Sequence, residues 1–185
     1  MNEYSISKND PIFEKLAKEF VVHDKGYFIL APSGVGKTYF VTNQKEKNWI
    51  DGDYLWDITG ADYLGDEWVY DFTKIQVVNK RCDKVTDTAK QLGFWVIGSS
   101  NYDLKPDAIV LPHWELHKSR ILLRENTAYD GGAKQKDLNG VLEHRKWIAK
   151  WQKKGVPKFE DLESATNYVK GRNLTSTKNA SKHFM

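Results

Sequence analysis

Short runs of apolar residues recur along the chain without the polar alternation of half-exposed strands. They are YFILA (27–31), NWID (48–51), FWVIGSS (94–100) and DAIVLP (107–112). Runs of this kind and length predict strands that are buried on both faces of a parallel sheet. VPKF (156–159) predicts a further short strand or a loop.

Longer segments with apolar residues at helical spacing separate these runs. Asp10 and Pro11 predict a capped start for the first helix, and Gly93 predicts the end of a helical region that begins near Glu67. Strands that alternate with helices indicate an α/β fold, with a mostly parallel sheet of about five strands covered by helices on both sides. The predicted helical segments are 11–22, 38–44, 67–92, 114–125, 138–155 and the end of 156–170.

The first predicted strand runs into a loop of the phosphate-binding type. Ala31-Pro32-Ser33-Gly34-Val35-Gly36-Lys37-Thr38 matches the pattern G-x-x-x-x-G-K-[ST] at every defined position except the first. The glycines let backbone N–H groups turn inward, the lysine reaches the β- and γ-phosphates, and the threonine hydroxyl faces Mg²⁺. The residues expected to bind the nucleotide are Ser33, Gly34, Val35, Gly36, Lys37 and Thr38.

Ala31 replaces the first glycine of that pattern. Alanine is compatible with this place, at the end of the strand, if the residue keeps a negative φ. The loop therefore predicts binding of a nucleoside triphosphate, although it does not say what happens to the triphosphate.

Two carboxylates follow the second predicted strand, as Asp51-Gly52-Asp53. In an open α/β sheet, ligands bind beyond the carboxyl ends of the strands, so these side chains are expected to face the bound phosphates. One carboxylate would order Mg²⁺ while the other accepts the proton of an attacking hydroxyl. A turn that merely ends the strand is the alternative. The later strands end in serines and in Pro-His, without the acid that motor and transporter ATPases place there.

APSGVGKT followed by WIDGDYLW resembles the small P-loop kinases, which include shikimate, gluconate, adenylylsulfate and nucleoside monophosphate kinases and polynucleotide 5′-kinases. The order of elements agrees over roughly residues 26–165. The resemblance implies a three-layer P-loop kinase fold with a helical lid. It also implies that Asp51 lies nearer the metal, together with Thr38, and that Asp53 approaches the acceptor.

The lid implied by the resemblance falls at about 120–145, in HKSRILLRENTAYDGGAKQKD and the start of the next helix. Arg120 and Arg124 stand one helical turn apart and are expected to act with Lys37 and Asp53 as catalytic residues. Lys134 and Arg145 are further candidates for the lid cation. These arginines could instead pair with acids on a solvated face.

Composition and charge limit the kinds of partner that this chain is expected to bind. The 185 residues carry a net charge of +3, but four basic residues and no acid lie in 170–185, and subtracting these four charges leaves −1 for the rest. We therefore expect one domain over 1–170 and a basic, disordered tail over 171–185. The single cysteine, Cys82, excludes an internal disulfide. No apolar run reaches the ~18 residues of a membrane span, and the start lacks a signal peptide, so we expect a cytoplasmic protein without a membrane partner.

These features predict an ATP-dependent and Mg²⁺-dependent kinase that transfers the γ-phosphate to a nucleotide, a nucleoside or a related small acceptor. One alternative is a kinase that acts on a hydroxyl within DNA, at a modified base or a 5′ end, with nucleic acid bound through the basic tail. Another alternative is a P-loop NTPase or nucleotide-binding module without a small acceptor.

Overall fold

The structure is a computed structural model that describes residues 5–65, 70–125, 127 and 132–181, with the backbone alone for 173–181. The chain divides into two units. Unit 1 comprises Met1–Leu30 and Lys37–Pro106, and unit 2 comprises Ala31–Gly36 and Asp107–Met185. The loop between the first strand and the second helix therefore groups with the second half of the chain.

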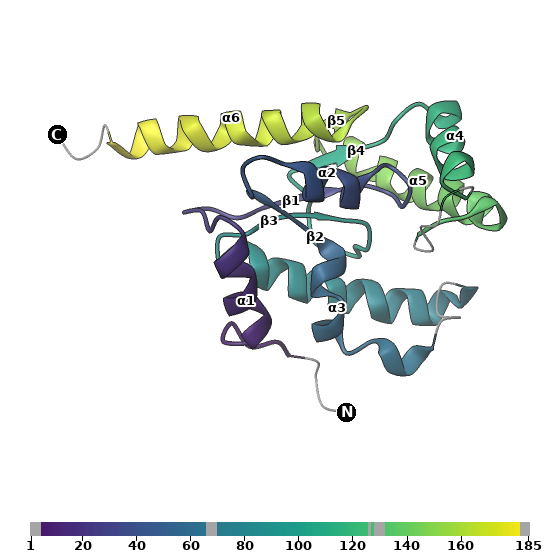
Figure 1. The fold of residues 1–185 in the computed structure, drawn as a ribbon, viewed down its shortest axis with the longest axis horizontal. Coiled ribbons are helices and arrows are strands. Elements are labelled where there is room, and N and C mark those ends of the chain that lie inside the picture. The colour runs from purple at the N-terminus through teal and green to yellow at the C-terminus, as the bar shows by residue number, and fades with distance from the viewer. Residues whose placement is uncertain (1–4, 66–69, 126, 128–131, 182–185) are drawn as a thin grey trace. The chain divides into compact units, whose positions relative to one another are not determined.

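Three parallel strands form the centre of unit 1 (Figure 1). They are β1 (Tyr27–Leu30), β2 (Trp49–Asp51) and β3 (Trp95–Gly98), in the order β2-β3-β1. Trp95 is paired with both Tyr27 and Trp49 across this sheet. All residues of the three strands are buried, as the continuous apolar runs predict.

Helices cover both faces of these strands, with α1 (Pro11–Glu19) and α3 (Phe72–Gln91) on one face and α2 (Lys37–Asn43) on the other (Figure 1). The Asp10 carboxylate caps α1 by accepting a hydrogen bond of 3.0 Å from the N–H of Ile12. Gly93 follows α3 with a φ of +90°, and a Cβ on it would lie 2.1 Å from the His23 carbonyl oxygen. Both helix ends that the sequence predicts are therefore confirmed.

Residues 52–64, for which the sequence predicts no element, form three single turns of 3₁₀-helix. These are η1 (Gly52–Leu55), η2 (Asp57–Thr59) and η3 (Asp62–Leu64). Arg81 on α3 donates hydrogen bonds of 3.0 and 2.6 Å to the carbonyl oxygens of Thr59 and Gly60 at the end of η2. The helix thus stabilises a segment that has little regular structure of its own.

Unit 2 contains a pair of parallel strands, β4 (Ala108–Val110) and β5 (Lys158–Phe159), which contact α5 and α6. Its helical elements are α4 (Trp114–Glu125), η5 (Gln135–Asp137), α5 (Leu138–Lys153) and α6 (Leu162–Ser181). The predicted α/β class with about five parallel strands is confirmed, because the pairings within both units are parallel. The region expected to be a lid spans the end of α4, η5 and the start of α5, and residues 126 and 128–131 within it lie outside the described residues.

The expected tail begins inside α6. The backbone of 171–181 is helical, whereas 182–185 lie outside the described residues, so the predicted domain end near 170 does not coincide with the end of an element. Arg172 lies over the ring of Tyr168 and 3.7 Å from the Asp107 carboxylate. Within the part of the chain that the structure describes, no helix is long and apolar enough to cross a membrane.

Candidate functional site

The loop Ala31–Gly36 has the backbone conformation that its glycines predict. Ala31 is fully buried directly after β1, and no non-glycine residue among those described has a positive φ, so alanine fits this place as predicted. Gly34 and Gly36 have φ values of +91° and +96°. A Cβ on Gly36 would meet no atom within 4 Å, so the conformation alone favours glycine there. A Cβ on Gly34 would also lie 2.6 Å from Cγ1 of Ile121.

Ser33 anchors the loop within unit 2 through two of its atoms. Its hydroxyl accepts a hydrogen bond of 3.0 Å from the N–H of Ala133, and the Ala133 carbonyl accepts one from the Arg124 guanidinium. The Ser33 carbonyl oxygen lies 2.8 Å from Nε2 of His117 on α4. The loop is therefore tied to α4 and to the turn before η5.

In unit 1, Thr38 and the Asp51-Gly52-Asp53 segment form a connected group. The Thr38 hydroxyl donates a hydrogen bond of 2.8 Å to Oδ2 of Asp51, and the N–H of Asp53 donates one of 3.2 Å to Oδ1. Asp51 is fully buried at the carboxyl end of β2. A Cβ on Gly52 would lie 3.0 Å from Cα of Gly98, so β3 leaves little room for a side chain between the two acids.

The surroundings of Asp53 strengthen it as a base. Although much of this residue is exposed, burial of its carboxyl group raises the pKa above 3.8, and the neighbouring charge of Asp51 raises it further. The charge of Lys37 opposes both effects and lowers the pKa of Asp53. Asp53 therefore binds a proton more tightly than an isolated aspartate does.

The opposing effects predict how the pKa of Asp53 responds to its neighbours. Lys37→Met should raise the pKa, because the lowering charge is lost, and Asp51→Asn should reduce it, because the repelling carboxylate is lost. The carboxyl ¹³C shift of Asp53, followed across pH by NMR, measures both changes. Lys45→Met, which removes an exposed cation just after α2, should leave the pKa of Asp53 unchanged. Equal shifts in all three variants would contradict the assigned causes.

Thr38 and Asp51 fit a magnesium ion. Mg²⁺ takes oxygen ligands and commonly uses one or two carboxylates together with substrate phosphates and water. The Thr38 hydroxyl donates its hydrogen bond to Asp51, so the lone pairs of the Thr38 oxygen remain available to a cation. No group of three or more His, Cys, Asp or Glu side chains suited to a metal occurs among the described residues, so a magnesium ion here would need further oxygen ligands from phosphate or water.

The cations of the expected lid differ in their surroundings. Arg120 is exposed on α4, whereas Arg124 is half-buried against the Gly132 and Ala133 backbone. A Cβ on Gly132 would lie 2.8 Å from the guanidinium of Arg124. Arg124 thus holds the turn that contacts Ser33, and Arg120 remains the more accessible of the two cations.

Two further residues of unit 2 are linked to the loop, His117 by direct contact and Arg145 through His117. His117 is fully buried, and Arg145 on α5 donates to it. Partial burial lowers the pKa of Arg145, and Glu160 opposes this effect. The sequence gives no local signal for this link, because the contact of His117 with the Ser33 carbonyl joins residues 84 positions apart.

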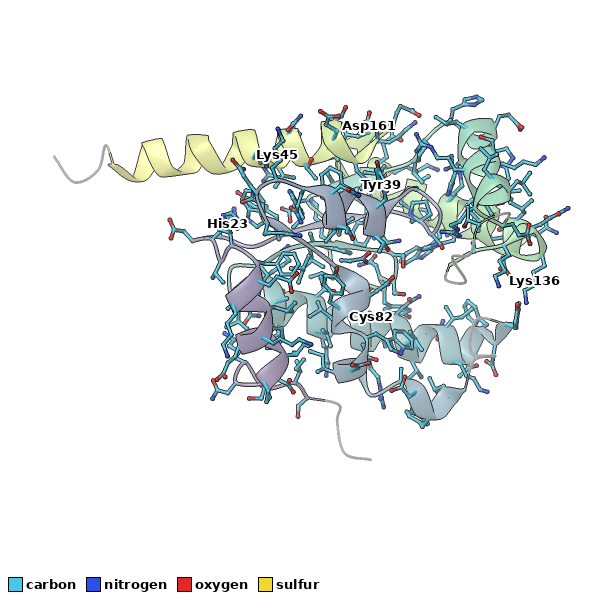
Figure 2. The ribbon with its side chains drawn as sticks, in the orientation of Figure 1. His23, Tyr39, Lys45, Cys82, Lys136 and Asp161 are labelled. Atoms are coloured by element: carbon cyan, nitrogen blue, oxygen red, sulfur yellow. The ribbon has the colours of Figure 1, made fainter. Side chains whose placement is uncertain are left out.

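A carboxylate on α3 organises the loop after β3. Asp83 accepts hydrogen bonds from the N–H groups of Tyr102, Asp103 and Leu104 and from the side-chain amide of Asn101, at 2.5 to 3.0 Å. The adjacent Cys82, labelled in Figure 2, has a pKa that burial raises to about 12. Cys82 is therefore not a nucleophile at neutral pH.

Comparison of the chain with protein-family models and with curated proteins found no match.

Proposed function

We propose that this protein is an ATP-dependent phosphotransferase that transfers the γ-phosphate to a small acceptor, and that the acceptor carries a hydroxyl. The observation that carries the proposal is the group of Thr38, Asp51 and Asp53, which follows a loop with two left-handed glycines. A nucleotide-binding module without an acceptor needs the loop and Thr38, but it has no use for a second carboxylate of raised pKa.

The residues of the loop suit a bound triphosphate. Glycines at 34 and 36 leave the backbone N–H groups of the loop without side chains that would cover them, and such groups bind phosphate oxygens. Lys37 follows Gly36 directly and supplies a cation for the β- and γ-phosphates. Bound Mg²⁺ would neutralise charge on the phosphates, and Thr38 and Asp51 are the residues that would hold it.

Asp53 determines which acceptor fits. The transfer breaks the bond between the γ-phosphorus and the bridging oxygen, forms a bond between the γ-phosphorus and the acceptor oxygen, and releases ADP. A hydroxyl acceptor must lose a proton, and the Asp53 carboxylate can accept it. A phosphate acceptor has no proton to lose in this way at neutral pH, and its negative charge is repelled by Asp53 and Asp51. Among the acceptors that the sequence leaves open, a nucleoside or another hydroxyl compound is therefore favoured over a nucleoside monophosphate.

The arginines of α4 are candidates for the cation that phosphoryl transfer requires. A transfer site must exclude water and neutralise the charge that spreads over the γ-phosphate. Arg120 is exposed and can turn toward a ligand, whereas Arg124 donates a hydrogen bond to the Ala133 carbonyl. We assign the charge-neutralising role to Arg120 and a supporting role to Arg124. The cytoplasmic location expected from the sequence stays a prediction.

A transfer assay tests the proposal directly. The protein is incubated with Mg²⁺, γ-labelled ATP and a panel of nucleosides, nucleoside monophosphates, sugars and oligonucleotides with free 5′ hydroxyls. Label on a nucleoside or sugar is the expected result. Label on oligonucleotides alone would identify the DNA kinase alternative, and label on monophosphates would contradict the preference for a hydroxyl acceptor.

The same assay separates a kinase from an NTPase. Release of free labelled phosphate at the same rate with and without every acceptor, together with loss of that release in Lys37→Met, would overturn the kinase and support the NTPase. Lys45→Met serves as the matched control, because it removes an exposed lysine of the same unit.

A further inference from the structure

The hydrogen-bond partners of His117 determine which of its two ring nitrogens carries the hydrogen. The Ser33 carbonyl oxygen, 2.8 Å from Nε2, is an acceptor and nothing else, so Nε2 must carry the hydrogen. The Arg145 guanidinium, whose Nη1 lies 2.9 Å from Nδ1, has donors and no acceptor, so Nδ1 must be unprotonated. His117 is therefore the neutral Nε2–H tautomer.

Arg145 is itself held in place at the start of α4. Its Nη2 donates a hydrogen bond of 2.6 Å to the Pro112 carbonyl, and its guanidinium lies over the ring of Trp114 at 5.6 Å. Because His117 is fully buried, its ring cannot exchange these partners for water. The two residues thus form a fixed chain from Pro112 through Arg145 and His117 to the Ser33 carbonyl.

This chain determines the orientation of one peptide group in the loop. The Ser33 carbonyl and the Gly34 N–H belong to the same peptide, and the described residues contain no cis peptide bond. In a planar trans peptide the C=O and N–H bonds point in opposite directions. Since the carbonyl is directed at His117, the Gly34 N–H is directed away from α4.

The orientation of this peptide also depends on close packing of Gly34 against α4. A Cβ at this position would lie 3.1 Å from Nε2 of His117 as well as 2.6 Å from the Ile121 side chain. The loop therefore approaches α4 as closely as a glycine backbone allows. A loss of the His117 donor would leave the Ser33 carbonyl without this partner and would let the peptide rotate.

We propose that His117 is a positioning residue for the phosphate loop, and that Arg145 holds it in the Nε2–H tautomer so that the Gly34 N–H stays available to a phosphate oxygen. The proposal rests on the proposed function, since it assigns the loop a triphosphate. In this role neither His117 nor Arg145 contacts the reacting atoms.

The affinity for Mg·ATP tests the positioning role. His117→Leu removes the donor and should weaken binding by about tenfold or more, whereas His117→Gln, whose amide nitrogen takes the place of Nε2, should stay within about threefold of the wild type. Arg145→Met should weaken binding and Arg145→Lys should restore part of the loss. His113→Leu, at an exposed histidine one turn earlier, is the matched control. A lower melting temperature with unchanged Mg·ATP affinity in His117→Leu and Arg145→Met would show a merely structural role and overturn the proposal.

The ¹⁵N spectrum of the imidazole provides a readout that does not depend on activity. In the wild-type protein at neutral pH, the His117 signals should show a protonated Nε2 and an unprotonated Nδ1, and Arg145→Met should allow the other tautomer. An Nδ1–H tautomer in the wild type would overturn the inference even if ATP binds. Absence of Mg·ATP binding in the wild type, with the Nε2–H tautomer present, would instead overturn the proposed function and with it the role assigned to the chain.

Discussion

Asp53→Asn should leave the affinity for Mg·ATP within about twofold of the wild type while it reduces phosphoryl transfer by about 10²- to 10⁴-fold. Asparagine keeps the size of the side chain and leaves the backbone N–H that donates to Asp51 in place, but it cannot accept the acceptor proton. Quantitative transfer assays with the acceptor found in the panel, together with titration calorimetry for Mg·ATP, measure the two effects.

The fold should survive this substitution. The pKa of Asp53 is raised in the folded protein, so the stability that this group contributes is present below its unfolded pKa and is lost as the pH rises through the folded pKa. At neutral pH the charged carboxylate is therefore a cost, and asparagine removes it. The melting temperature at neutral pH should be equal or higher.

Asp57→Asn is the matched control for Asp53→Asn, because Asp57 is an exposed carboxylate four positions later, in η2. It should leave transfer unchanged. Transfer by Asp53→Asn at more than a tenth of the wild-type rate would refute the role of Asp53 as proton acceptor, and equal losses in both variants would point to a general effect of charge.

Lys37→Met should have the second large effect, a loss of about 10²- to 10³-fold in transfer, together with weaker binding of Mg·ATP. Lys37 is buried as the first residue of α2, and its charge acts on Asp53, so its removal would take away the cation proposed for the phosphates and would change the pKa of the proposed base. Methionine keeps the length of the stem and limits the disturbance of packing.

The two effects of Lys37→Met can be separated by pH. Because Lys37 lowers the pKa of Asp53, the residual activity of the variant should require a higher pH than that of the wild type. Lys37→Arg should retain part of the affinity, since it keeps the charge. Unchanged transfer in Lys37→Met would remove the basis for assigning the loop to a triphosphate.

Much of the fold could be predicted because its signals are local. The buried runs around Ile29, Ile50 and Ile97 define their strands by composition, and Asp10, Pro11 and Gly93 mark helix ends through hydrogen bonds and φ values that depend on neighbouring residues. For the same reason the glycines at 34 and 36 could be assigned their left-handed backbone from the motif.

The parts that could not be predicted depend on contacts between distant residues. The turns between Gly52 and Leu64 are short, and Arg81, 21 positions beyond Gly60, holds the end of one of them. The bond between His117 and Ser33 likewise has no local pattern. Arg120 and Arg124 share a helix and a spacing, and only the position of the Ala133 backbone distinguishes the accessible cation from the engaged one.

The carboxylate of Asp83 has a consequence for how this sequence can change over evolutionary time. The turn at Tyr102, Asp103 and Leu104 is held through main-chain N–H groups, which every residue except proline possesses. The amino acids at these three positions can therefore change without loss of these hydrogen bonds. The residue that specifies the turn, Asp83, lies on a helix 19 or more positions earlier. A search for distant relatives should accordingly weigh an aspartate in this helix and the asparagine at 101, and should allow residues 102–104 to vary.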